Sequence, residues 1–143
     1  MTAISPKDVA ETFEIRAALE GLAAEKMLER LTPEDLERFR RLYEALGKPV
    51  TTEKARAFHE AKNTEFHALI VELSGSRKLI EMYRSLNAHI QIARIHDSRQ
   101  GWAERMEQER KEHHEIFRAI EARDAARASA PPTHQSCGAR LDR

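Results

Sequence analysis

Two polar side chains that can bind a metal lie where the sequence predicts the inner face of a helix. Asn63 and His67 are four residues apart, and at about 100° per residue on an α-helix they share one face. The same face carries Phe66 and Ile70, and His59 falls on it one turn earlier. This segment therefore predicts a column of polar groups directed into a hydrophobic core.

A second polar residue of this kind lies near the carboxyl end of the chain. His113 precedes Ile116 by three residues and Phe117 by four, which places its imidazole on the buried stripe of a helix. The adjacent His114 is rotated toward the solvated side, beside Arg110. Of the two neighbouring histidines, His113 is the better candidate ligand.

Imidazoles in a core need partners, because each unsatisfied buried polar group costs about 1–3 kcal/mol. A divalent metal bound by these imidazoles would offset that cost. Imidazole nitrogen with an oxygen ligand suits Zn, Ni, Cu, Mn or Fe; we favour Zn or Ni, with Mn or Fe as alternatives. The other interpretation is that each inward histidine is a core residue hydrogen-bonded to a backbone carbonyl or to an acid. The residue spacing alone does not distinguish such a histidine from a metal ligand. For His59, His89, His96 and His114 we favour a surface or hydrogen-bonded histidine.

The first helix that must position these groups begins with Ser5 as its cap and Pro6 in its first turn, and it runs to about Arg30. Its apolar residues recur every three or four positions, which predicts one buried stripe. Arg16 and Glu20 then fall largely on other faces. The expected stripe consists of Ile15, Leu19, Leu22 and Ala23.

The other helices are bounded by the same start and stop signals. The second starts at Thr32 and Pro33 and stops at Gly47, and the third follows Thr51 or Thr52 and stops at Gly75; the fourth spans about 77–96, the fifth begins at Trp102, and a sixth begins at Asp124 and stops at Pro131. No segment alternates as a strand would. We therefore expect an all-α antiparallel bundle of about six helices.

The size of the chain fits one domain. Its 143 residues are enough for a single core, and we divide them into an N-terminal linker over 1–7, a helical domain over 8–130 and an irregular tail over 131–143. The 24 basic residues balance the 24 acidic ones, so no general attraction to DNA or to anionic lipid is expected. One cysteine, and no apolar run of about 20 residues, favour the cytoplasm and no membrane.

Taken in order, several motifs resemble the FCD (FadR C-terminal) effector-binding domain of GntR-family bacterial transcriptional regulators. The similarity covers about residues 8–130. No single piece is specific, but the ordered set is. The matching pieces are EIRAALE over 14–20, Leu31-Thr32 with Leu36, Asn63-x-x-Phe66-His67, and Glu112-His113-x-x-Ile116 continuing to Asp124.

The resemblance implies a metal site. FCD domains bind one metal through an Asp or Asn, a His four residues later, and two histidines from the last two helices. Carried over, this implies Asn63, His67 and His113, with His134 one position off the expected spacing. The metal in the family usually helps hold a small carboxylate effector, an organic or sugar acid. Arg16, and less strongly Arg94, could pair with that carboxylate; for Arg16 a surface salt bridge with Glu20 is the alternative.

Two departures from the family pattern stand out. The family usually carries a winged helix-turn-helix before this domain, and here Met1 falls just before the first expected helix. We therefore expect DNA binding only through a domain absent from this chain. The tail, with Pro131 and Pro132, breaks the last helix before His134.

Three functions fit the sequence. The first is a non-catalytic effector sensor that binds a divalent metal and a small carboxylate, as a homodimer. The second is a metal-free interaction module that pairs with a full-length regulator. The third is a small metalloenzyme, but Asn63 stands where a His-Glu-x-x-His motif starting at His59 needs its second histidine. We rank them in that order.

Overall fold

A computed structural model describes residues 5–96 and 102–123 of the chain, with side chains described over 5–88 and 106–123. These residues fold into helices without a strand. The helices are α1 (Pro6–Leu28), α2 (Pro33–Leu46), α3 (Glu53–Glu72), α4 (Arg77–His96) and α5 (Trp102–Glu121). The all-α prediction is confirmed, and the sixth expected helix from Asp124 lies outside the described residues.

Local signals start the first three helices, as expected. The Ser5 hydroxyl accepts a hydrogen bond from the Asp8 amide at 3.1 Å. Thr32 forms a reciprocal capping box with Asp35, and the Thr52 hydroxyl accepts from the amide of Ala55 at 3.0 Å. These bonds satisfy amide groups that the first helical turn leaves without partners.

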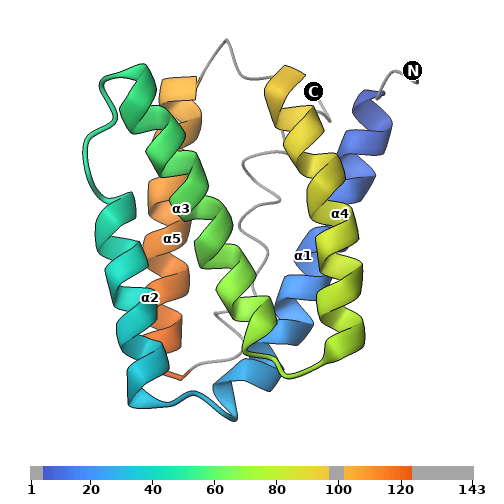
Figure 1. Ribbon diagram of the computed structural model, residues 1–143, viewed down its shortest axis with the longest axis vertical. Coiled ribbons are helices and arrows are strands. Elements are labelled where there is room, and N and C mark those ends of the chain that lie inside the picture. Colours follow the sequence, from blue (N-terminus) through green and yellow to red (C-terminus); the bar gives the residue numbers. More distant parts are fainter. Residues whose placement is uncertain (1–4, 97–101, 124–143) are drawn as a thin grey trace.

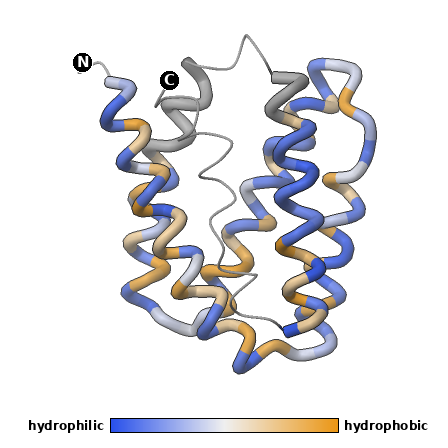
Figure 2. The backbone as a smooth tube through the Cα atoms, turned by 180° about the vertical axis from the view of Figure 1, so that it is seen from behind, coloured by the Kyte–Doolittle hydropathy of each residue, from blue (hydrophilic) through white to orange (hydrophobic). Residues whose placement is uncertain are grey.

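The helices form a bundle in which α3 packs against α1, α2 and α4, while α5 packs against α2. Figure 1 shows α2, α3 and α5 together on one side, with α1 and α4 side by side on the other. In the coloured parts of Figure 2, hydrophobic positions recur among hydrophilic ones along the helices, as expected for amphipathic helices. Two aromatic contacts join the elements: Phe39 meets Phe66 edge-on at 5.6 Å, and Tyr43 stacks on Phe117 at 4.6 Å.

The buried face of α1 differs from the predicted stripe. Ile15 is 48% exposed and Leu22 is 46% exposed, whereas Arg16 is only 2% exposed. Ala23 is buried as predicted, and the inner face also contains Phe13, Ala24, Met27 and Leu28. The prediction failed because it assigned faces by hydrophobicity alone, while the structure gives Arg16 a buried partner on its own helix.

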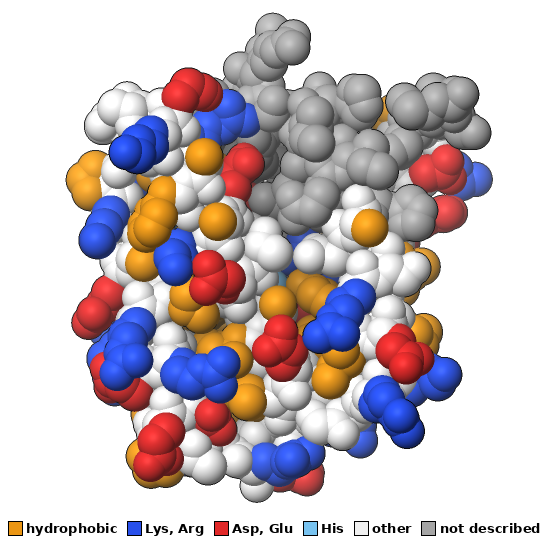
Figure 3. Space-filling view, viewed as in Figure 1, with side chains coloured by type: hydrophobic (Ala, Val, Ile, Leu, Met, Phe, Trp, Pro, Cys, Tyr) orange, Lys and Arg blue, Asp and Glu red, His pale blue; other side chains and the backbone are white. Residues whose placement is uncertain are grey.

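Charge is distributed evenly over the visible surface. In Figure 3, Lys and Arg side chains alternate with Asp and Glu side chains without a field of one sign. This agrees with the balance of basic and acidic residues in the sequence. Among the helices that the structure describes, none has the length and apolar character needed to cross a membrane.

Candidate functional site

The polar residues predicted from two distant segments meet in the core. The Nε2 atom of His113 on α5 lies 2.6 Å from Oδ1 of Asn63 on α3. Both residues are 2% exposed. Because an amide oxygen only accepts, the histidine nitrogen donates in this hydrogen bond. The fold therefore brings together two of the expected metal ligands from positions 50 residues apart.

His67 joins this pair and is held by an acid. Its ring centroid lies 5.5 Å from that of His113, and its Nδ1 atom lies 2.9 Å from Oε1 of Glu20 on α1. An acid on one ring nitrogen fixes the orientation of the imidazole and leaves the other nitrogen for a ligand. Nε2 of His67 is thus the nitrogen available to a metal.

Glu20 is the centre of a buried network rather than a surface residue. Its Oε2 atom accepts from Arg16 Nε at 2.8 Å and from the Tyr83 hydroxyl at 2.8 Å. The Arg16–Glu20 salt bridge considered from the sequence is present, but the two side chains are only 3% and 11% exposed. The network joins α1, α3 and α4 around one carboxylate.

The ionisation of this network follows from its contacts. Burial alone would raise the pKa of Glu20, but the interactions with His67 and Arg16 outweigh burial and hold this pKa well below its usual range. Burial opposes the charge of Arg16, yet Glu20 raises the pKa of that guanidinium further. Burial, and then the negative charge of Glu20, raise the pKa of the Tyr83 hydroxyl. All three groups therefore keep their usual charge states at neutral pH.

A further polar pair continues the column by one turn. His59 is 2% exposed, and its Nε2 atom lies 3.6 Å from Oε1 of the buried Glu109 on α5. Neither ring nitrogen of His59 makes a hydrogen bond in the described part of the chain. His59 is therefore a buried histidine beside an acid rather than a surface residue. His114 is exposed, as predicted, and its Nδ1 atom lies 2.6 Å from the Tyr43 hydroxyl.

The side chains around Asn63 can hold a metal only if the amide oxygen of Asn63 is itself a ligand. Within the described residues, no three His, Cys, Asp or Glu side chains are placed to hold one ion. His67 and His113 supply imidazole nitrogens, and Asn63 supplies an oxygen beside the nitrogen of His113. Two imidazoles with one oxygen suit Zn or Ni and leave positions open.

Other expected site residues fall elsewhere. His134 lies outside the described residues, and so does the side chain of Arg94, although its backbone belongs to α4. The side chains of His89 and His96 also lie outside them. The predicted ligand set is therefore assembled at Asn63, His67 and His113.

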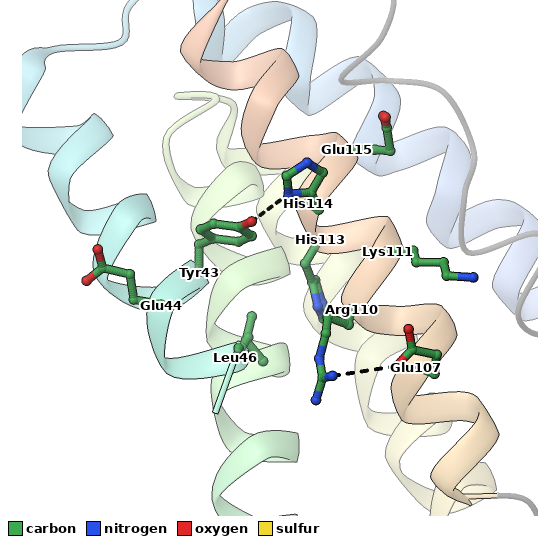
Figure 4. A pocket seen from close by; sticks show the side chains of 10 residues that line it. Tyr43, Glu44, Leu46, Glu107, Arg110, Lys111, His113, His114 and Glu115 are labelled. Carbon is green, nitrogen blue, oxygen red and sulfur yellow. Dashed lines mark hydrogen bonds and ion pairs between the residues drawn. The ribbon is translucent and has the colours of Figure 1, made fainter. Parts of the chain in front are cut away.

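A pocket of about 560 Å³ lies between α2 and α5 and has His113 as the one lining residue that it shares with this site. Figure 4 shows Tyr43 and Leu46 of α2 facing the α5 residues across it, with His113 behind Arg110. The pocket is mixed in charge. Its lining comprises Tyr43, Glu44, Leu46, Gly47, Glu107, Arg110, Lys111, His113, His114 and Glu115.

Sequence reasoning did not assign Glu20, Tyr83 or Glu109 to the site. For Glu20 and Glu109, the spacing of residues in the sequence could have indicated their place in the site. Glu20 follows Arg16 by four residues and Glu109 precedes His113 by four, so each shares a helix face with a residue already singled out. Nothing in the sequence indicated that Tyr83 would reach Glu20, 63 positions away.

The fold and the site define an all-helical domain with a polar site inside its core. Residues 11–131 match the family model described as the FCD domain. The chain therefore belongs to the FCD family, which confirms the resemblance drawn from its motifs and makes it an effector-binding regulatory domain of the GntR type.

Comparison with solved structures supports the fold. The chain is similar to E. coli McbR/YncC, with a TM-score of 0.71 and 20% sequence identity, over 99% of this chain and 70% of that one. At this identity the similarity concerns the fold alone. No curated protein matches the chain.

Proposed function

We propose that the chain is the effector-sensing domain of a GntR/FadR-type transcriptional regulator, and that it binds a divalent metal and a small carboxylate in the core of the bundle. The observation that carries the proposal is the convergence of Asn63, His67 and His113 from two helices. A cytoplasmic homodimer is part of the proposal. DNA would be reached through a DNA-binding domain separate from this helical bundle.

The metal would be held by His67 through Nε2 and by His113 and Asn63 through atoms that already lie together. Glu20 supports this role, because its bond to Nδ1 holds the His67 ring in place. When bound, the metal would supply a Lewis-acidic centre with open positions for carboxylate oxygens. The rest of the site would orient that carboxylate and exclude water.

Arg16 supports carboxylate binding in a different way from the one first expected. Its guanidinium is buried and bonded to Glu20 through Nε, and a guanidinium has five N–H donors. An effector carboxylate could therefore bind Arg16 through its terminal nitrogens or compete with Glu20 for it. In either case effector binding would alter the contact between α1 and α3 that Glu20 makes.

Elemental analysis of protein purified without added metal tests the metal site. We expect the wild type and His114→Ala to contain metal, and His67→Ala and His113→Ala each to contain one equivalent less per chain. His114→Ala is the matched control, because it removes the neighbouring imidazole on the exposed side of α5. Equal metal content in all four proteins, or no metal even after dialysis against zinc or nickel, would contradict the proposal.

The effector class is tested by thermal melts of the metal-loaded protein with a panel of organic and sugar acids. A ligand that binds only the folded state raises the melting temperature. The rise should be absent for the matching alcohols and amides and should shrink in Arg16→Lys, which keeps the charge but loses the guanidinium geometry. A response that is equal for acids and amides would argue against carboxylate recognition.

One observation favours the second candidate, a metal-free interaction module. His67 bonds to Glu20 and His113 bonds to Asn63, so each imidazole has a hydrogen-bond partner within the protein. On this alternative, the chain acts by pairing with a full-length regulator. It predicts a melting temperature that is unaffected by chelators and unaffected by zinc.

A further inference from the structure

The pocket between α2 and α5 lies where the shorter of the two helices ends. Arg40 of α2 bonds to Glu121 of α5 at 3.2 Å, and the Tyr43 hydroxyl lies 2.6 Å from Nδ1 of His114, so the helices are held together along this stretch. α2 stops at Leu46, whereas α5 extends past that point toward its amino-terminal end (Figure 1). The space beside the extension is the pocket of about 560 Å³, a size typical of small-molecule sites.

Charged side chains of α5 form one wall of this pocket. Glu107, Arg110 and His114 are spaced by three and four residues, so they share one face of the helix. In Figure 4 a dashed line joins the guanidinium of Arg110 to Glu107. The two charged groups are 3.5 Å apart and their side chains are 44% and 56% exposed, so their ion pair contributes little to stability. A ligand with matching charges can therefore replace it.

The wall formed by α2 is apolar and ends at the carboxyl end of a helix. Tyr43 and Leu46 line the pocket with a ring and an aliphatic side chain, and Gly47 adds no side chain. The last turn of α2 contains no basic residue, so no side chain of that turn offsets the partial negative charge that a helix has at its carboxyl end. A positively charged group is favoured at this end of the pocket.

The charges of the lining fit a ligand that carries both signs. The lining includes three acidic and two basic residues, which are Glu44, Glu107, Glu115, Arg110 and Lys111. A purely anionic ligand would meet the surplus of acids, and a purely cationic one would meet the two bases. An α-amino acid has its ammonium and carboxylate groups next to each other, as the opposite charges of Arg110 and Glu107 are. Its side chain would then lie against Tyr43 and Leu46.

We propose that the pocket between α2 and α5 binds a free α-amino acid with an apolar side chain. Arg110 binds the carboxylate, which a guanidinium can hold through two N–H donors. Glu107 and the carboxyl end of α2 bind the ammonium group, and Tyr43 and Leu46 contact the apolar side chain. This site is separate from the metal and carboxylate site proposed in the core, and it requires no metal.

Isothermal titration calorimetry of the full chain with L-leucine and L-phenylalanine, in the presence of a chelator, tests this inference. We expect both amino acids to bind the wild type and His67→Ala with equal affinity. N-acetyl-L-leucine lacks the positive charge and L-leucinamide lacks the negative one, so each should bind at least about tenfold more weakly than L-leucine. Arg110→Gln and Glu107→Gln should each weaken the binding of L-leucine by a similar factor.

Arg118→Gln is the matched control. It removes another exposed arginine of α5 that pairs with an acid three residues away, but Arg118 does not line the pocket. It should therefore leave the affinity for L-leucine unchanged. Circular dichroism melts establish that each variant folds, and the chelator carries the comparison with the core site if His67→Ala does not fold.

The other outcomes overturn the proposal in different ways. The absence of binding at millimolar concentrations of either amino acid excludes the site. N-acetyl-L-leucine that binds as tightly as L-leucine indicates a carboxylate site, and L-leucinamide that does so indicates a cation site. Equal weakening by Arg118→Gln and Arg110→Gln would show that the position of the charge is irrelevant.

Nuclear Overhauser effects place the ligand independently of affinity. The methyl protons of bound L-leucine should show effects to the ring of Tyr43, identified by their loss in Tyr43→Leu. The other tyrosine, Tyr83, lies in the core beside Glu20. Effects to Tyr83 alone would place the amino acid in the core and overturn the proposal.

Discussion

At the scale of single residues, the site depends on acids that hold the imidazoles and the guanidinium. Glu20 uses one oxygen for His67 and the other for Arg16 and Tyr83. The carboxylate of Glu20 accepts hydrogen bonds from several side chains at once. Removing its negative charge would leave Arg16 buried without its counter-ion. Glu20 is therefore expected to contribute to stability as well as to the orientation of His67.

Replacement of Glu20 tests this coupling. We expect Glu20→Gln to lower the free energy of unfolding by about 2–3 kcal/mol, because the amide keeps the shape but loses the charge that Arg16 needs. Urea unfolding of the two proteins measures the difference. Glu25→Gln, at an exposed position on the same helix, is the control and should change stability little. Similar losses in both variants would show that the buried network contributes nothing of its own.

Glu121 offers a pH-dependent contact between α5 and α2. Hydrogen bonds from Arg118 at 2.7 Å and from Arg40 at 3.2 Å hold the pKa of Glu121 below its usual range. A carboxyl with a lowered folded-state pKa stabilises the protein above its unfolded pKa, about 4.3, and this contribution is lost as the pH falls through the folded value. The three side chains are partly exposed to solvent, so salt should weaken the effect.

Carboxyl-selective NMR titration measures the midpoint of Glu121 directly. In Arg118→Gln and Arg40→Gln we expect this midpoint to rise toward the ordinary value, and in the wild type we expect it to rise with added salt. A midpoint that is identical in all three proteins would contradict the role assigned to the two arginines.

At the scale of elements, the turns fix how the helices meet. The turn between α3 and α4 contains Gly75, whose φ is +77°. L-residues with a side chain rarely adopt that conformation. The guanidinium of Arg30, which follows α1, lies over this glycine and reaches the Ser74 carbonyl at 3.4 Å. The turn therefore brings the end of α1 against the start of α4.

An alanine at this turn should be costly. A Cβ at Gly75 would overlap Nη1 of Arg30, so the arginine must move and lose its contact with Ser74. With the strain of a positive φ, we expect Gly75→Ala to destabilise the domain by about 1–2 kcal/mol.

Gly47 is the matched control for this substitution. Its φ is −83°, and an added Cβ would meet nothing closer than 3.6 Å. Gly47→Ala should therefore leave the melting temperature unchanged or raise it slightly. Equal destabilisation by both alanines would mean that the positive φ and the arginine contact are irrelevant.

At the scale of the whole molecule, α1 has an apolar outer face in addition to its buried one. Ile15 and Leu22 are both about half exposed and lie two turns apart on this helix. In Figure 1, α1 and α4 form one side of the bundle, and Met82 on α4 is 49% exposed. Exposed large apolar residues on neighbouring helices are common at interfaces between subunits, which supports the proposed homodimer.

Leu22→Glu tests this interface. Because it places a charge on the apolar face of α1, we expect it to lower the apparent mass in sedimentation equilibrium from dimer to monomer while the fold is kept. Phe58→Glu, at a residue 44% exposed on α3, should leave the dimer intact. A wild-type protein that is monomeric at all concentrations, or equal dissociation by both variants, would argue against an interface at α1.

The sequence by itself determined the helices and the inward direction of Asn63, His67 and His113. Helix starts depend on a side chain and an amide three residues away, as at Ser5 and Thr32, and a shared face depends only on the helical repeat. Both features depend on residues that are close together in the chain, so the local sequence is sufficient to predict them.

Tertiary structure alone decided which groups surround those residues. The contacts of Glu20 with His67 and Tyr83 span 47 and 63 positions, and His59 meets Glu109 from another helix. The inner face of α1 was mispredicted for the same reason: Ile15 faces outward and Arg16 inward because burial depends on what packs against the helix. Apolar periodicity describes one helix at a time, whereas the free energy of burying a charge depends on partners that only the folded bundle brings within reach.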